Sequence, residues 1–379
     1  MQSSDPFPEF HGHKKGMRDL ADLRILVTGA CGVTSRAVVR SLKSSPHFSR
    51  ARFVGSDICD NLYGIAEGLY DVMYRVPHSA DKRYAETVND ICEQEAIDLA
   101  IVIPELEVLH WTHTKMRARC LLPPENFCRI AGSKVALYEA LQGSTVVPRF
   151  AIATRDSLMA PGYSPASGWP CWIRDHEVGS TSGRGSLLAS NHEELKAWVV
   201  LNPKIGSFMV SEFLPGRNFA CHLLYHDGKL IKVGVYERLA YFMGRIAPSG
   251  ISGNISRGRL LNDMRIVDVS RSAVESICQQ TNETMQGLVA VDLREDAHGN
   301  PMITEVNLRH VACTSAFASA GNNLAEAQIF ATLGMPDRVG ALDHPYPPGN
   351  YILRDIDGPA LWVPELELPS IGSAVTVLP

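Results

Sequence analysis

Two carboxylates and an amide near the end of the chain have the types and spacing of a metal site. They are Asp292, Glu305 and Asn307. Apolar runs flank a His-Gly-Asn-Pro turn signal between the two carboxylates, so this segment is expected to form a β-hairpin. A turn centred between His298 and Gly299 places Asp292 directly opposite Glu305, and Asn307 then shares the face of Glu305.

The facing carboxylates are compatible with two environments. Carboxylates that face each other on a sheet repel, unless a cation lies between them or water screens them. Oxygen ligands of this kind suit Mg²⁺, which commonly takes one or two carboxylates together with substrate phosphates. The alternative is a surface hairpin whose acidic side chains face water. The hairpin alone does not decide between a metal site and a solvated surface.

Composition restricts the class of protein. The chain has 379 residues, of which 45% are hydrophobic and 20% charged, so a globular protein of two or three domains is expected. The formal net charge of −5 and the lack of a long basic run argue against a nucleic-acid partner. No run approaches the roughly 18 apolar residues that span a membrane. The nine cysteines form no CxxC pair, which is typical of reduced thiols in a cytoplasmic protein.

The first third of the chain alternates expected strands and helices. Residues 1–22 are polar and are expected to form a flexible arm. A strand at 23–28 leads into a glycine turn at 29–35 and a helix, and further strands are expected at 52–56 and 99–103. This alternation predicts a parallel sheet with helices on both faces. A nicotinamide-binding domain is one interpretation, but the Gly-x-x-Gly-x-x-Ser turn matches the dinucleotide fingerprint only loosely.

The middle of the chain carries a basic strand residue and a glycine loop. An amphipathic helix that begins at Ser133 precedes a strand that ends at Arg174. The loop at residues 179–185 can turn many backbone N–H groups toward phosphate oxygens, although a flexible linker is the alternative. Mostly antiparallel strands are expected afterwards, interrupted by a long amphipathic helix that begins at Met264.

In this order the segments resemble the ATP-grasp superfamily, and most closely its carbamoyl-phosphate-synthase-like branch as a single module. The resemblance implies an α/β and α+β fold. In it, a Rossmann-like pre-ATP-grasp domain that does not bind NAD is followed by a two-subdomain ATP-grasp fold. The expected boundaries are 23–125 for the first domain, 126–206 for the small subdomain, 207–340 for the C-terminal subdomain with the hairpin, and 341–379 for an extension.

The resemblance also implies a site for ATP and for Mg²⁺ or Mn²⁺. The residues that it assigns to ATP are Lys134, Arg174, Gly183, Gly185, Glu212, Phe213, Leu214 and Asn218. The implied metal ligands are Asp292, Glu305 and Asn307. Arg309, Asn307 and Arg257 are the expected catalytic residues.

The chain departs from the family's pattern at the ribose-binding position. Residues 210–216 resemble the family's adenine-contacting hinge. The family usually continues there with Gly-Arg-Glu, whereas here Asn218 follows Gly216-Arg217. Asparagine can hydrogen-bond a hydroxyl but cannot supply a charge-assisted bond, so lower nucleotide affinity or a different ribose contact is expected. The single module also argues against the two-step chemistry of a full carbamoyl-phosphate synthase.

The function that the resemblance implies is ATP-dependent ligation of a carboxylic acid to an amine. Oxide is not a leaving group at neutral pH, so ATP first converts the acid to an acyl phosphate, which the amine then attacks. The alternatives are a ligase of the same fold that uses a thiol, a hydroxyl or ammonia, and a nucleotide-binding protein without turnover. The expected partners are small carboxylic acids and amines, and a homodimer is a further possibility. Tail strands expected at 351–354 and 361–363 either close the domain or form the edge of such a dimer.

Residues 235–259 are the expected region for recognition of the acid. Here Arg257 and Arg259 are candidates to pair with a carboxylate, and Glu237 is a candidate to pair with the amine. Ordinary surface charges are the alternative. Glu105 and Glu107, which follow the strand at 99–103, are further candidates to face the cleft, because ligands bind at the carboxyl ends of parallel strands.

Overall fold

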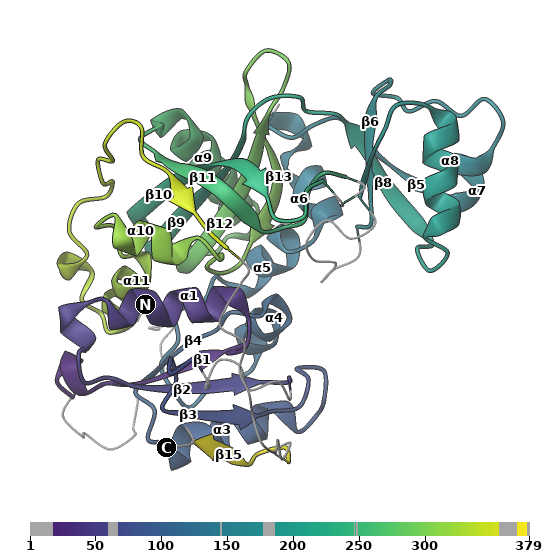
Figure 1. Ribbon diagram of the computed structural model, residues 1–379. Helices are drawn as coiled ribbons and strands as arrows, with labels where there is room; N and C mark the ends of the chain where they lie inside the picture. Colours follow the sequence, from purple (N-terminus) through teal and green to yellow (C-terminus); the bar gives the residue numbers. More distant parts are fainter. Residues whose placement is uncertain are drawn as a thin grey trace, which may run out of the picture.

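The structure is a computed structural model that describes residues 18–59, 67–144, 146–176, 186–245, 247, 249–355 and 370–376. In this part of the chain three separate sheets form, with five, six and four strands (Figure 1). The five-stranded sheet belongs to the N-terminal domain, and the six-stranded sheet contains the expected hairpin. The mixture of parallel and antiparallel sheets confirms the α/β and α+β class.

The N-terminal sheet is parallel except at one edge. Its strand order is β15-β3-β2-β1-β4, with β15 antiparallel to β3. The sequence predicted β1, β2 and β4 but not β3 or β15. The strands are β1 (Arg24–Thr28), β2 (Arg52–Asp57), β3 (Val72–Arg75), β4 (Leu99–Ile101) and β15 (Ala374–Thr376), and the helices are α1 (Val33–Lys43), α3 (Tyr84–Gln94) and α4 (Glu105–His113).

The glycine turn after β1 is closed by hydrogen bonds within the protein. Gly29 has a φ of 61°, and a Cβ there would lie 2.6 Å from Pro104 Cγ, so only glycine fits. Asp57 ends β2, where dinucleotide-binding domains present an acid to the ribose. Its carboxylate instead accepts hydrogen bonds from the backbone N–H groups of Cys31 and Cys59, each at 2.8 Å. These contacts give the turn a structural role.

The six-stranded sheet has an apolar face and a mixed face. Helix α9 (Met264–Thr281) packs on the apolar face, and its buried side chains join those of the strands in one core. The other face is covered at one end by α10 (Thr314–Ser319) and α11 (Leu324–Thr332). The strands, in spatial order, are β13 (Pro301–Asn307), β12 (Gly287–Glu295), β9 (Asn218–His226), β10 (Lys229–Tyr241), β11 (Ile255–Leu261) and β14 (Ile352–Leu353).

The four-stranded sheet forms the small subdomain, at the right of Figure 1. Its strands are β5 (Phe150–Thr154), β6 (Cys171–Arg174), β7 (Leu187–Ala189) and β8 (Ser207–Glu212), with helices α7 (Arg155–Met159) and α8 (His192–Leu201). Because β8 pairs with β5 and β6, this unit runs through Glu212 rather than ending at residue 206. Helices α5 (Glu125–Ala131) and α6 (Lys134–Leu141) contact α9 and β13, so they belong with the six-stranded sheet.

Both ends of the described chain pack on the domains. Arg18 Nε donates a hydrogen bond to Asp98 Oδ1 at 3.2 Å, so residues 18–22 are not part of a loose arm. In the tail, β14 extends the six-stranded sheet and β15 extends the N-terminal sheet, so the extension is not a separate unit. The expected strand at 361–363 lies outside the described residues. Short 3₁₀ helices occur at η1 (Leu20–Asp22), η2 (Pro46–Phe48), η3 (Gln142–Ser144) and η4 (Pro336–Arg338).

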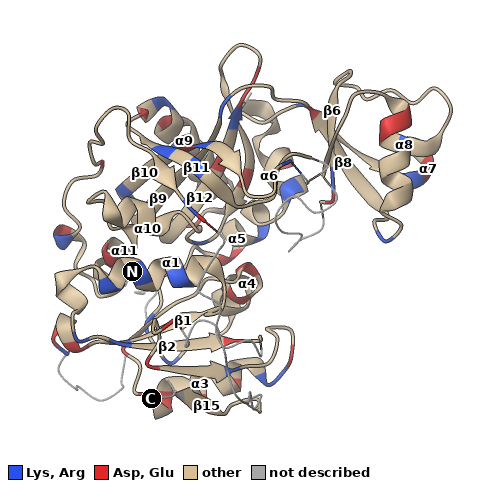
Figure 2. Ribbon diagram, viewed as in Figure 1, with Lys and Arg blue, Asp and Glu red and all other residues tan. Residues whose placement is uncertain are grey.

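Charges of both signs are interspersed over the elements of all three sheets (Figure 2). In the described part of the chain, no helix combines the length and the apolar content that crossing a bilayer requires. All nine cysteines are free thiols.

Candidate functional site

A cavity of about 280 Å³ receives side chains from the parts of the chain that form all three sheets. Ten of the sequence-predicted site residues line it: Lys134, Arg174, Glu212, Phe213, Leu214, Asn218, Asp292, Glu305, Asn307 and Arg309. Gly183 and Gly185, which were expected to contact phosphate, lie outside the described residues. Arg257 is absent from the described lining. The cavity therefore gathers most of the predicted nucleotide and metal residues in one place.

The hairpin places the two carboxylates as predicted, although its turn differs. Asp292 pairs with Glu305 in the register of β12 and β13. The next pairs, ending at Glu295 with Pro301, are shifted by one residue, so the turn is centred on His298 and Thr304 is an extra residue in β13. This β-bulge restores the predicted pairing.

Strand alternation brings the remaining polar residues to the same face. Arg238 on β10 and Arg294 on β12 both pair with Asn218 on β9. Arg294 is two residues along β12 from Asp292, which pairs with Glu305. Residues two apart on a strand share a face, so these five side chains lie together in the cavity.

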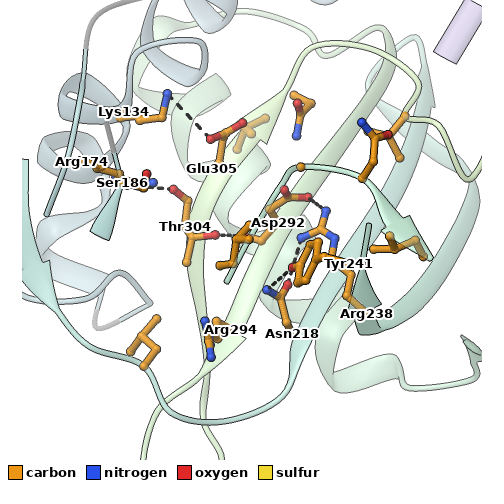
Figure 3. Close-up of a pocket in the computed structure, with 18 of the residues that line it drawn as sticks. Lys134, Arg174, Ser186, Asn218, Arg238, Tyr241, Asp292, Arg294, Thr304 and Glu305 are labelled. Carbon is orange, nitrogen blue, oxygen red and sulfur yellow. Dashed lines mark hydrogen bonds and ion pairs between the residues drawn. The ribbon is translucent and has the colours of Figure 1, made fainter. Parts of the chain in front are cut away.

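Each carboxylate has a cationic neighbour (Figure 3). Lys134 Nζ lies 3.8 Å from Glu305 Oε2, and Arg238 Nη2 lies 2.6 Å from Asp292 Oδ1. Burial raises the pKa of Asp292; Arg238 opposes this rise and Glu305 adds to it. The repulsion that the facing carboxylates would experience is thus offset by cations from α6 and β10. Sequence reasoning did not single out Arg238.

The donor set fits a small, hard cation. The side chain of Glu305 is 35% exposed, and the Asn307 side chain makes no hydrogen bond with other described residues. A carboxylate and an amide oxygen with free coordination positions are the ligands that Mg²⁺ takes. Among the described residues no three His, Cys, Asp or Glu side chains form a metal cluster, and the assignment of Asn307 as a metal ligand stays a prediction.

Arg174 connects the small subdomain to the hairpin. Its Nη2 donates to Tyr138 Oη and to the Thr304 carbonyl oxygen, each at 3.1 Å. The bulge turns this carbonyl out of the ladder and makes it available. The side chain is buried, and its Nε has no hydrogen-bond partner among the described residues. Arg174 therefore positions β6 against β13, and its unpaired donor can serve a ligand.

The amide of Asn218 is already bonded within the protein. Its Nδ2 donates to Tyr241 Oη at 2.9 Å, and its Oδ1 accepts from Arg238 Nη1 at 2.9 Å. An amide oxygen has two lone pairs, so one acceptor position is left for a hydroxyl. The expected weakened ribose contact stays a prediction.

The acid-recognition residues expected on β10 and β11 do not reach the cavity. Arg257 is exposed on β11, and Glu237 faces the opposite side of the sheet. There Glu237 accepts hydrogen bonds from Arg217 at 2.9 Å and from Arg259 at 2.6 Å. The cause is a bulge at Ile231, because regular pairing from the turn would have placed Glu237 opposite Asn218.

An arginine outside the predicted set also lines the cavity. Arg354, which follows β14, lines the cavity and packs over the Phe242 ring at 5.9 Å. No motif in the sequence marks it, because it arrives through a strand pairing distant in the chain. Arg309 also lines the cavity and donates to the His310 carbonyl at 3.0 Å.

Of the two glutamates after β4, only Glu105 lines the cavity. Burial raises the pKa of Glu105 to about 7, while Arg309 acts in the opposite direction. Glu107 is buried in the N-terminal domain. Glu105 and Glu107 are two residues apart on helix α4, so their side chains point in different directions. Helical periodicity could have predicted this difference from the sequence.

The comparisons with known proteins rest on structure alone. No family model matches the sequence, and no curated protein matches it. Several solved structures are similar. L-amino acid ligase from Bacillus licheniformis is 13% identical with a TM-score of 0.58, over 85% of this chain and 75% of that one.

Two further structures carry a nucleotide. N5-carboxyaminoimidazole synthetase from Staphylococcus aureus, complexed with ADP, is 13% identical with a TM-score of 0.61, over 84% of this chain and 79% of that one. D-alanine–D-alanine ligase from Bacillus anthracis, complexed with ATP, is 14% identical with a TM-score of 0.51, over 84% of this chain and all 100% of that one. Identity at this level is informative about the fold only.

Proposed function

We propose that this chain, which has the ATP-grasp fold, is a ligase that uses ATP to join a carboxylic acid to an amine through an acyl phosphate. The products are an amide or peptide, ADP and phosphate. The observation that carries the proposal is the cavity in which the facing carboxylates Asp292 and Glu305 meet Lys134, Arg174 and Arg309. This pattern of charge suits a metal-bound triphosphate beside a carboxylic acid.

The nucleotide is proposed to lie between the two ATP-grasp subdomains. The hinge residues Glu212, Phe213 and Leu214 line one part of the cavity and are assigned to the base. Lys134 and Arg174 are assigned to the phosphates, because a cation orients the oxygens and offsets their charge. Glu305 and Asn307 would hold Mg²⁺, with Asp292 opposite Glu305 in the hairpin, and the ion would neutralise charge on the phosphates.

Two arginines are proposed to hold the acid. Arg309 follows β13 and Arg354 follows β14, and both line the cavity. A guanidinium presents a planar fork of donors that matches a carboxylate, so either residue can fix the acid in a single orientation. Glu105, at the start of α4, is assigned to the amine because it is the carboxylate that the N-terminal domain contributes to the cavity lining.

The proposed reaction then depends on position more than on covalent catalysis. The carboxylate oxygen attacks the γ-phosphorus of ATP and ADP leaves, which gives the acyl phosphate. The amine attacks the acyl carbon, and phosphate leaves with the bonding electrons while the amine loses a proton. Holding both reactants in one water-poor cavity raises the rate and limits hydrolysis of the acyl phosphate.

The test is to incubate the protein with ATP, MgCl₂, pooled amino acids and small carboxylic acids, measure ADP and phosphate, and identify products by mass. ADP release that requires both an acid and an amine supports the proposal. Formation of AMP, or no turnover with a broad panel, contradicts it. The same product masses distinguish the second candidate, a ligase of this fold that uses ammonia, a thiol or a hydroxyl.

A further inference from the structure

Arg238 lines the cavity, and the proposed reaction gives it no task. It lies on β10, and its side chain is only 12% exposed. Its neighbour Asp292 is 18% exposed, whereas Glu305, opposite Asp292, is 35% exposed. The two carboxylates of the hairpin therefore differ. Both line the cavity, but Asp292 is the less exposed of the two and is hydrogen-bonded to a buried guanidinium.

The guanidinium of Arg238 is held on several sides (Figure 3). Nη2 donates to Asp292 at 2.6 Å, and Nη1 donates to Asn218 Oδ1 at 2.9 Å and to the Phe219 carbonyl at 3.4 Å. Its carbon Cζ lies 5.4 Å from the centre of the Tyr236 ring. A planar group bonded in this way has little freedom to turn away from the carboxylate.

A divalent ion on Asp292 would have to share the carboxylate with this guanidinium. Charges of the same sign repel strongly at a few ångströms in a poorly solvated site. Relief would require the arginine to give up its hydrogen bond to Asn218 and its contact with the Tyr236 ring. The obstacle at Glu305 is smaller, because Lys134 Nζ lies 3.8 Å from its carboxylate, beyond hydrogen-bond distance, whereas Arg238 donates to Asp292 at 2.6 Å.

We propose that the Arg238 guanidinium takes the place of a second divalent cation at Asp292, so that the chain binds one Mg²⁺ with each nucleotide, at Glu305 and Asn307. This inference rests on the proposed nucleotide function. It assigns Asp292 to the positioning of Arg238 instead of direct metal binding. Arg238 in turn supplies a permanent positive charge beside the phosphates.

The test counts bound Mn²⁺ by the loss of the free-ion signal in electron paramagnetic resonance. Protein and the non-hydrolysable analogue AMP-PNP are held at equal concentrations while Mn²⁺ is added. The expected count is one ion per chain for the wild type and for Arg238→Lys, which keeps the charge. Arg238→Gln, which removes it, is expected to bind two. Arg259→Gln removes a charge from the neighbouring strand, outside the described lining, and is expected to bind one.

A second pair of variants tests the same inference through the carboxylates. Asp292→Asn is expected to leave the Mn²⁺ count at one and the Mn²⁺ affinity within about threefold of the wild type. Glu305→Gln is expected to weaken Mn²⁺ binding about thirtyfold or more, which corresponds to about 2 kcal/mol. This pair decides the matter if circular dichroism shows that Arg238→Gln does not fold.

Each outcome has a definite consequence. Two ions per wild-type chain would overturn the inference, as would one ion in a folded Arg238→Gln variant or a large loss of affinity in Asp292→Asn. Failure of the wild type to bind AMP-PNP with any Mn²⁺ would instead contradict the proposed nucleotide function.

Discussion

Replacing Glu305 by glutamine is expected to abolish turnover while changing the stability of the fold little. Glu305 pairs with Lys134 at 3.8 Å, and its side chain is 35% exposed. A pair of this kind contributes about 0.2–1 kcal/mol. Removal of the charge also relieves repulsion from Asp292 across the hairpin, which offsets part of that loss. The free energy of unfolding is therefore expected to change by less than about 1 kcal/mol.

The effect on catalysis is expected to be far larger. Loss of a charged group that organises the transferring phosphoryl costs about 10³-fold in rate, or about 4 kcal/mol. ADP release measured with a coupled assay gives the rate, and urea unfolding gives the stability. Glu139→Gln, an exposed glutamate on α6, is the matched control and is expected to match the wild type in both. More than a tenth of wild-type turnover, or a stability loss of several kcal/mol, would refute the assignment.

Three other substitutions test separate parts of the structure. In Gly216→Ala the new Cβ would lie 2.5 Å from Glu295 Cβ, so urea unfolding should show a loss of about 1–3 kcal/mol, whereas Gly206→Ala, in open space, should change little. In Arg294→Met, calorimetry should show about tenfold weaker ATP binding with unchanged stability, because Arg294 Nε is buried in the cavity without an acceptor in the described part of the chain. Burial lowers the pKa of His222 to about 3, whereas the pKa in the unfolded chain is about 6.5. As the pH falls, the unfolded state therefore binds the proton before the folded state does. The free energy of unfolding should decrease below about pH 6.5. At pH 5 this loss amounts to about 2 kcal/mol, and His222→Leu should lack it; equal pH dependence in both proteins would contradict the argument.

Local rules were sufficient for the carboxylates of the site. Turn residues and strand alternation placed Asp292 opposite Glu305, and the structure has that pairing. The turn is centred on His298, half a residue earlier than predicted. The bulge at Thr304 shifts the register by one residue, which gives the predicted pairing of the two carboxylates. Glycine, proline and asparagine fix a turn through their own backbone preferences, which can be recognised without knowledge of the rest of the fold.

Bulges and distant pairings could not be predicted in this way. Because of the bulge at Ile231, Arg238 lines the cavity and Glu237 does not. The apolar residues of this strand give no sign of a bulge. Arg354 reaches the cavity because the two-residue strand β14 pairs with β11, about a hundred positions earlier in the chain. Such short strands are stabilised by the sheet that they join, so their sequences carry little signal of their own.

The contact between Arg174 and the carbonyl of Thr304 has a consequence for how this protein can vary. A main-chain acceptor does not depend on the identity of its side chain, so substitutions at position 304 that preserve the bulge leave the contact intact. Position 174, by contrast, must keep a long side chain with donors at its end. Relatives of this chain should therefore be variable at one end of the contact and restricted at the other. A search for positions that change together would not detect the link between the small subdomain and the hairpin.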